Sequence, residues 1–310
     1  MTAYVHFMAE PMTGNDPRGR RTRASAILWN LLPQRFRRDR PVVPVVLLTG
    51  VIGSSGPLRP GLSMAGIARA LDRAFGMRNA VAVALAINSP GGSPAQSHLI
   101  FRRIRNLAEE KNRRVIAFVE DAAASGGYMI ACAADEIIAD PNSIVGSIGV
   151  VGASFGFDKL IARFGIERRL YTSGERKAML DPFMPENAED VERLKKLQRE
   201  IHDDFTALVK SRRGGKLVSD DLFNGEFWTG RRALDLGLVD AVGDLHSVLR
   251  QRFGNKVWTP LVSADRGWFK RRLFGAARGD LIAGGLAQTG LAEDMISALE
   301  ARAHWARYGL

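Results

Sequence analysis

Apolar stretches of strand length alternate with segments of helical periodicity through the middle of the chain. The apolar stretches are residues 42–52, 80–87, 114–119 and 144–151. The periodic segments between them are residues 62–75, 94–110 and 126–134. Strands with almost no polar positions are typical of parallel sheets that helices cover on both faces. We therefore expect an α/β fold, built from repeated strand–helix units around a mostly parallel sheet.

The longest periodic segment follows at residues 188–210. Its apolar side chains recur at three- and four-residue steps: Val191, Leu194, Leu197, Ile201, Phe205 and Leu208. This spacing predicts a long surface helix with one apolar face. His202 lies beside Asp203 and Asp204 on this helix, so we expect it on the solvated face.

The pattern divides the 310 residues into three parts. We expect a basic arm at 1–40, a core domain at 41–255 and a helical tail at 256–310. With 46% hydrophobic and 25% charged residues, the composition is that of a globular protein. A chain this long needs no disulfide or structural metal to fold. Cys132 is the only cysteine, which excludes intrachain disulfides, zinc ribbons and iron–sulfur clusters.

The basic arm contributes +5 of the formal net charge of +11, because it has eight arginines against three acidic residues. Its apolar run at 24–32 is shorter than the roughly 20 residues that span a bilayer, and arginines follow it instead of a cleavage site. The arm is either an amphipathic segment on an anionic membrane, with Trp29 and Phe36 at the interface, or a solvated tail. A similar patch at 268–274 favours the membrane. No nucleic-acid recognition motif occurs, so we expect no nucleic-acid partner.

Two serines are candidate nucleophiles. Ser154 lies in Gly-Ala-Ser-Phe-Gly at 152–156, which matches the G-x-S-x-G elbow of α/β hydrolases. That elbow also requires an acid and a histidine further along the chain. The downstream histidines, His202, His246 and His304, have no supporting context, and none of the chain's five histidines has metal-ligand spacing. We therefore rank Ser154 second and expect no metal and no cofactor.

The other candidate, Ser125, lies at the start of the predicted helix at 126–134 and precedes two glycines. Its hydroxyl either caps that helix or attacks a substrate whose negative oxygen the free N–H groups of the helix stabilise. A glycine loop, Asn-Ser-Pro-Gly-Gly at 88–92, follows the strand at 80–87 and can supply further N–H donors. The loop lacks the Lys-Ser/Thr ending of a phosphate-binding P-loop.

A serine nucleophile needs a base, and no histidine is placed for this role. A lysine can serve if burial keeps it neutral. Moving a lysine pKa from about 10.4 to about 7.5 costs roughly 4 kcal/mol, so such a base needs a dry pocket. Lys177 is a candidate because Ala, Met and Leu follow it, although most lysines lie in water.

Five motifs occur in an order and spacing that resemble the signal peptide peptidase A (protease IV) family. They are residues 88–92, Ala-Ser-Gly-Gly-Tyr at 124–128, Gly-Ser-Ile-Gly-Val at 146–150, Ser-Gly-x-x-Lys at 173–177, and the segment at 227–240. The resemblance covers about residues 41–250. It implies a Clp-protease/crotonase-like fold and peptide hydrolysis by a Ser–Lys dyad.

Carried over by motif, the resemblance assigns five residues. It makes Ser125 the nucleophile, Lys177 the general base and Ser147 the residue that orients the lysine amine. The backbone N–H groups of Gly92 and Gly126 would form the oxyanion hole. The reaction would proceed through an acyl-enzyme at Ser125 Oγ.

The resemblance also implies a serine endopeptidase that cleaves apolar peptides such as signal-peptide remnants. Family members are homo-oligomers in which neighbouring subunits complete the active sites, and the sequence leaves open whether Ser125 and Lys177 meet within one subunit. Members are commonly anchored by a transmembrane helix, whereas this sequence shows only the basic arm. We therefore expect a cytoplasmic enzyme at the periphery of the membrane's cytoplasmic face. Two alternatives stay open: a crotonase-type acyl-CoA thioester enzyme, and a non-enzymatic scaffold at a membrane surface.

Overall fold

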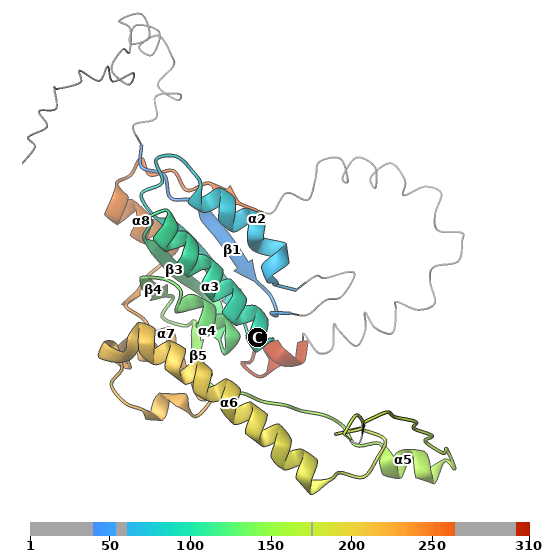
Figure 1. Ribbon diagram of the computed structural model, residues 1–310. Coiled ribbons are helices and arrows are strands. Elements are labelled where there is room, and N and C mark those ends of the chain that lie inside the picture. Colours follow the sequence, from blue (N-terminus) through green and yellow to red (C-terminus); the bar gives the residue numbers. More distant parts are fainter. Residues whose placement is uncertain (1–39, 54–60, 175, 264–301) are drawn as a thin grey trace, which may run out of the picture. The chain divides into compact units, whose positions relative to one another are not determined.

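The computed structural model describes residues 40–53, 61–174, 176–263 and 302–310 (Figure 1). The described residues from Pro41 onward belong to one compact unit. The predicted membrane-binding segment at 24–32 and the patch at 268–274 lie outside the described residues.

One sheet forms the centre of the fold. Its strands are β1 (Val45–Thr49), β2 (Val83–Ser89), β3 (Val115–Ala124), β4 (Glu136–Ala139), β5 (Ile144–Gly146), β6 (Phe227–Thr229), β7 (Ala241–Val242) and β8 (Leu261–Val262). The main order is β6-β5-β3-β2-β1-β8, and β4 pairs with β3 and β7. The β5–β6 pair is antiparallel, and the other pairs within the described residues are parallel. The prediction of an α/β fold with a mostly parallel sheet is confirmed.

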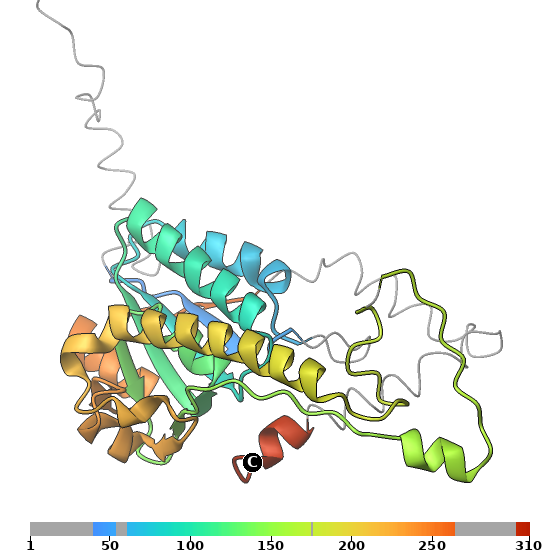
Figure 2. The same ribbon diagram turned by 60° about the horizontal axis from the view of Figure 1, so that its bottom comes forward.

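Helices connect and cover these strands. They are α2 (Met64–Phe75), α3 (Pro94–Glu110), α4 (Gly126–Ala131), α5 (Asp158–Arg163), α6 (Ala188–Arg213), α7 (Gly230–Asp235) and α8 (Leu245–Phe253). In Figure 1, α2 and α3 lie side by side over the sheet, and Figure 2 shows α6 as the long helix.

Three boundaries differ from the sequence prediction. The strand expected at 144–151 ends at Gly146, because Ser147 adopts a left-handed φ of +53° that turns the chain out of the sheet. The helix expected at 126–134 ends at Ala131. Within the tail expected to be helical from residue 256, residues 261–262 form β8, which pairs with β1, and residues 302–306 are helical.

The sheet is buried on both faces, which explains the continuous apolar runs. In β2, Val83, Leu85 and Ile87 face the larger core cluster, beneath α2, α3 and α4. Ala84 and Ala86 face the opposite cluster, which includes side chains of α8. Alternate residues of a strand point to opposite faces, so both sets must be apolar.

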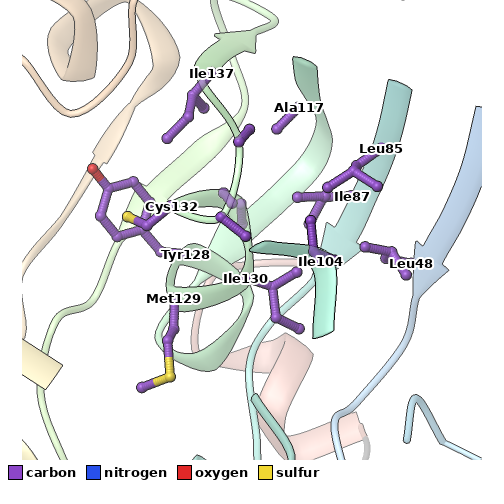
Figure 3. Packing of buried hydrophobic residues seen from close by; sticks show 14 of the residues in the cluster. Leu48, Leu85, Ile87, Ile104, Ala117, Tyr128, Met129, Ile130, Cys132 and Ile137 are labelled. Carbon is purple, nitrogen blue, oxygen red and sulfur yellow. The ribbon is translucent and has the colours of Figure 1, made fainter. Parts of the chain in front are cut away.

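The short helix α4 is packed inside the larger cluster (Figure 3). Tyr128, Ile130 and Cys132 are almost completely buried there. Burial raises the pKa of the Cys132 thiol to about 12, so the thiol stays neutral and serves as a core side chain. This packing fixes the helix that follows Ser125.

A buried ion pair joins the end of α6 to the segment before β7. The Arg213 side chain is 3% exposed, and its Nη1 donates to Asp240 Oδ2 at 2.6 Å. Asp240 also accepts hydrogen bonds from Lys216 Nζ at 2.6 Å and from the Ile137 backbone at 2.8 Å. Burial by itself would raise the pKa of Asp240, but these hydrogen bonds together hold the pKa below its usual range.

Replacing Asp240 with asparagine is expected to lower the free energy of unfolding by about 3 kcal/mol at neutral pH, because the buried guanidinium of Arg213 loses its counter-charge. A carboxylate with a lowered folded-state pKa contributes stability above its unfolded pKa, and this contribution is lost as the pH falls through the folded value. Denaturant unfolding should therefore show the difference between wild type and Asp240→Asn shrinking below about pH 4.

The matched control is Asp220→Asn. Asp220 pairs with Lys210 at 2.7 Å, but its side chain is 83% exposed, so its loss should change the stability by less than about 1 kcal/mol. Equal stabilities of wild type and Asp240→Asn at neutral pH would show that the buried pair is not a stabilising contact.

Candidate active site

The carboxyl ends of four strands lie along one edge of the sheet. Because β1, β2, β3 and β5 are parallel neighbours in the order β5-β3-β2-β1, the segments that follow them are brought together. In open α/β sheets this edge is where ligands bind. The segments include the predicted nucleophile after β3, the glycine loop after β2 and the predicted orienting serine after β5.

Ser125 occupies a sharp turn between β3 and α4. Its φ of +51° and ψ of −121° are rare for a residue with a side chain and cost on the order of 1–3 kcal/mol. The backbone is held by a hydrogen bond from Ser125 N to Gly146 O at 2.8 Å. The Ser125 hydroxyl forms no capping hydrogen bond with α4. This geometry argues against the capping interpretation and leaves the hydroxyl available for chemistry.

The glycine loop lies directly against Ser125. A Cβ atom on Gly91 would come within 2.8 Å of Ser125 Cβ and 3.0 Å of Gly126 N. A Cβ atom on Gly92 would come within 2.2 Å of the Ile52 carbonyl oxygen. Ile52 N in turn donates to Gly91 O at 2.8 Å. The loop therefore needs glycines at both positions in order to approach this closely.

Two backbone N–H groups are left unpaired at this contact. Gly126 is the first residue of α4, where an N–H has no acceptor within the helix. Within the described residues, neither Gly126 N nor Gly92 N donates a hydrogen bond. Donors of this kind beside a nucleophile can bind the negative oxygen of a tetrahedral intermediate.

Ser147 follows β5 and is 4% exposed. Its N–H donates to Glu226 O at 2.6 Å. The Tyr308 hydroxyl lies 3.1 Å from Ser147 Oγ and 3.4 Å from Pro90 O, and the Tyr308 ring packs edge-on against Phe227 with 5.0 Å between centroids. Residues near the C-terminus thus support both Ser147 and the glycine loop, a role that nothing in the sequence indicated.

Ser125 and Ser147 line the same pocket, with a volume of about 450 Å³. Residues 149–151 and 223–225 form two of its walls, and side chains of α6 form a third. Among these side chains is His202, which is half-buried. The expectation that His202 lies on a solvated face is therefore wrong, because the helix turns this side chain toward the pocket.

Lys177 does not line this pocket. It is exposed and lies in the segment that joins β5 to α6, which also contains α5 (Figure 2). Large apolar side chains are exposed throughout this segment: Val151, Phe155, Leu160, Phe164, Ile166, Leu170, Tyr171, Met179, Phe183 and Met184. A single chain thus brings Ser125, Ser147, Gly92 and Gly126 together and leaves Lys177 apart from them.

The competing serine has no such surroundings. Ser154 is exposed and lies eight residues beyond the end of β5 at Gly146 and before the start of α5 at Asp158. The pocket that it lines contains no histidine among the described residues. The G-x-S-x-G match at 152–156 therefore lacks the strand–turn–helix context that a nucleophile elbow requires.

Comparison with known proteins finds a peptidase family and relatives that are named proteases. Residues 108–254 match the sequence profile of peptidase family S49. The chloroplast serine protease SPPA of Arabidopsis thaliana is 39% identical over 168 residues, which cover 53% of this chain and 24% of that protein. A putative protease of Methanocaldococcus jannaschii is 35% identical over 170 residues, covering 54% of each chain.

A longer match extends over 288 residues of a Brucella abortus protein named Na⁺/H⁺ antiporter NhaA, at 54% identity. It covers 92% of this chain but only 39% of that protein. In the part of this chain that the structure describes, no helix is both long enough and apolar enough to cross a membrane. The profile match contains Ser125, Ser147 and Lys177, so the similarity to peptidase family S49 includes three of the predicted site residues.

Proposed function

We propose that this chain is a serine endopeptidase in which Ser125 is the nucleophile and Lys177 the general base. The observation that supports this most strongly is the strained turn at Ser125. Its hydroxyl forms no capping hydrogen bond, and the N–H groups of Gly92 and Gly126 beside it have no acceptor within the described residues. A crotonase-type thioester enzyme would have no use for a serine held in this way. The proposed substrates are extended, largely apolar peptides such as signal-peptide remnants.

In the proposed reaction, the uncharged amine of Lys177 removes the proton from Ser125 Oγ as the oxygen attacks the peptide carbonyl carbon. The N–H groups of Gly92 and Gly126 bind the resulting oxyanion. The lysine ammonium then protonates the departing amine, which leaves an acyl-enzyme ester. A water molecule, deprotonated by the same lysine, attacks this ester and releases the second product and Ser125.

The proposal includes a homo-oligomer in which Lys177 reaches Ser125 of a neighbouring copy. Its support is the position of Lys177 outside the Ser125 pocket together with the exposed apolar side chains of its segment. Large exposed apolar surfaces mark interaction sites in soluble proteins. Ser147 also lines this pocket, and in the proposal its hydroxyl forms a hydrogen bond with the incoming amine.

The proposed location is the cytoplasmic face of a membrane, with the basic arm at 1–40 as the contact. The support is the sequence of the arm, which has eight arginines against three acidic residues. Anionic lipid headgroups attract such segments by about 1 kcal/mol per basic residue near the surface.

A fluorophosphonate probe tests the nucleophile directly, because an activated serine oxygen displaces fluoride and forms a stable phosphonate ester. With the full-length assembled protein, peptide mass mapping should find the adduct on Ser125. The Ser125→Ala variant should remain unlabelled. An adduct on Ser154 instead, or equal labelling of wild type and Ser125→Ala, would show that the assignment of the nucleophile is wrong.

A further inference from the structure

The pocket beside Ser125 is lined by cations without a carboxylate. Lys195 and Arg199 reach it from α6 and Arg307 from the C-terminal residues, and no Asp or Glu is among its described lining residues. Lys195 pairs with Glu192 at 3.1 Å. Within the described residues, Arg199 and Arg307 have no acidic partner. The nucleophile therefore faces an uncompensated positive charge.

The excess of positive charge is specific to this pocket and does not follow from the net charge of the chain. A pocket of about 570 Å³ near α5 is lined by Asp158, Asp181, Glu186, Glu189 and Asp190 against two arginines. Another of about 580 Å³ beside β4 has three acidic and three basic residues. Of these three pockets, only the one that contains Ser125 lacks a carboxylate.

One face of α6 supplies the charged wall. Lys195, Gln198, Arg199 and His202 are spaced at three- and four-residue steps, so their side chains lie on the same side of the helix. His202 Nε2 is buried and has no hydrogen-bond partner within the described residues. Buried polar atoms are rarely left unpaired in folded proteins, so this nitrogen is available to a ligand or a water molecule in the pocket.

We infer that this pocket binds a carboxylate of the peptide substrate close to the scissile bond. The inference rests on the proposed peptidase function and adds a charge preference to it. Arg199 is the central specificity residue, since its planar guanidinium suits bidentate carboxylate binding. The carboxylate is either an Asp or Glu side chain or the free C-terminus of a short peptide, and the two sources can be separated by experiment.

The test compares kcat/KM of the assembled enzyme for matched fluorogenic peptides. In the first set of pairs, one peptide has Glu and the other has Gln at the same position, and each position flanking the cleaved bond is tested in turn. A second pair differs only by a C-terminal acid or amide. A single charge contact in a partly exposed site should favour the acidic member of at least one pair by about fivefold. This preference should shrink at high salt.

In the variant Arg199→Gln, the ratio of kcat/KM for the acidic peptide to kcat/KM for its neutral partner should be close to one. Arg199→Glu should reverse it and favour a peptide with Lys in place of Glu. The matched control is Lys196→Gln, which removes the same charge from an exposed site on the same helix that does not line the pocket. This control should keep the wild-type ratio.

Three outcomes would overturn the inference. Equal kcat/KM for both members of every pair in the wild type would show that the pocket has no charge preference, and the peptidase function would still stand. A wild-type ratio that persists in Arg199→Gln would exclude Arg199 as its source. If Arg199→Gln changed the mass of the oligomer but not the kcat/KM ratio of acidic to neutral peptides, Arg199 would be assigned to a contact between subunits. Failure of Ser125-dependent hydrolysis of any peptide would instead contradict the proposed function itself.

Discussion

Peptide hydrolysis is expected to fall on the order of 10⁴-fold or more in kcat when Ser125 is replaced by alanine, as in other enzymes that lose the residue forming the covalent intermediate. Without Oγ no acyl-enzyme can form, and the unpaired N–H groups of Gly92 and Gly126 have no attacking atom to assist. The measurement is the steady-state rate with a fluorogenic apolar peptide, using assembled protein of unchanged oligomer mass.

Two controls separate this result from misfolding. Alanine retains the Cβ atom of serine, so the strained backbone at position 125 is no worse in the variant, and the melting temperature should stay within a few degrees of wild type. Ser154→Ala removes the competing hydroxyl from an exposed site and should leave the rate unchanged. A fully active Ser125→Ala variant would exclude Ser125 as the nucleophile.

Replacement of Lys177 by methionine is expected to lower kcat by about 10²- to 10⁴-fold, the usual contribution of a general base. Methionine keeps much of the length of the side chain and removes the amine. Lys159→Met is the matched control, because Lys159 is an exposed lysine of α5 on the same segment between β5 and α6. That variant should retain wild-type activity.

Mixing the two inactive variants tests where the lysine acts. If Ser125 of one copy uses Lys177 of its neighbour, co-assembly of Ser125→Ala with Lys177→Met restores sites that contain both groups. With random assembly of equal amounts, about a quarter of the sites are intact. No recovery after unfolding and joint refolding would show that the two residues act within one subunit. Full activity of Lys177→Met alone would exclude Lys177 as the base.

Local sequence signals predicted the central units of the fold. Helix α3 spans Pro94–Glu110 as expected, since Ser93 caps its first turn by accepting a hydrogen bond from Gln96 N and proline occupies its first position. Strands β2 and β3 were predicted from apolar runs that require burial on both faces. The helix cap and the apolar runs depend only on residues close together in the chain, so they can be predicted from a single sequence.

Other features depend on contacts between distant parts of the chain. The sequence around Tyr308 does not indicate its position beside Ser147 and Pro90, because the contact spans 161 residues to Ser147 and 218 to Pro90. Strand β8 is only two residues long and forms because β1 offers it an edge. The ordered motifs predicted Ser125, Ser147 and the two glycines as one group, and the structure places them together. The role of Arg199 depends on which face of α6 turns toward the pocket, which periodicity alone does not specify.

The left-handed backbone at Ser125 has a consequence for how such a protein can change over time. Glycine would relax this conformation at little steric cost, yet it would remove the only hydroxyl that the turn presents. Selection for thermal stability alone would therefore favour glycine at position 125, and the resulting protein would lack the nucleophile. We expect serine with a positive φ to be kept at this position only where catalytic turnover is under selection.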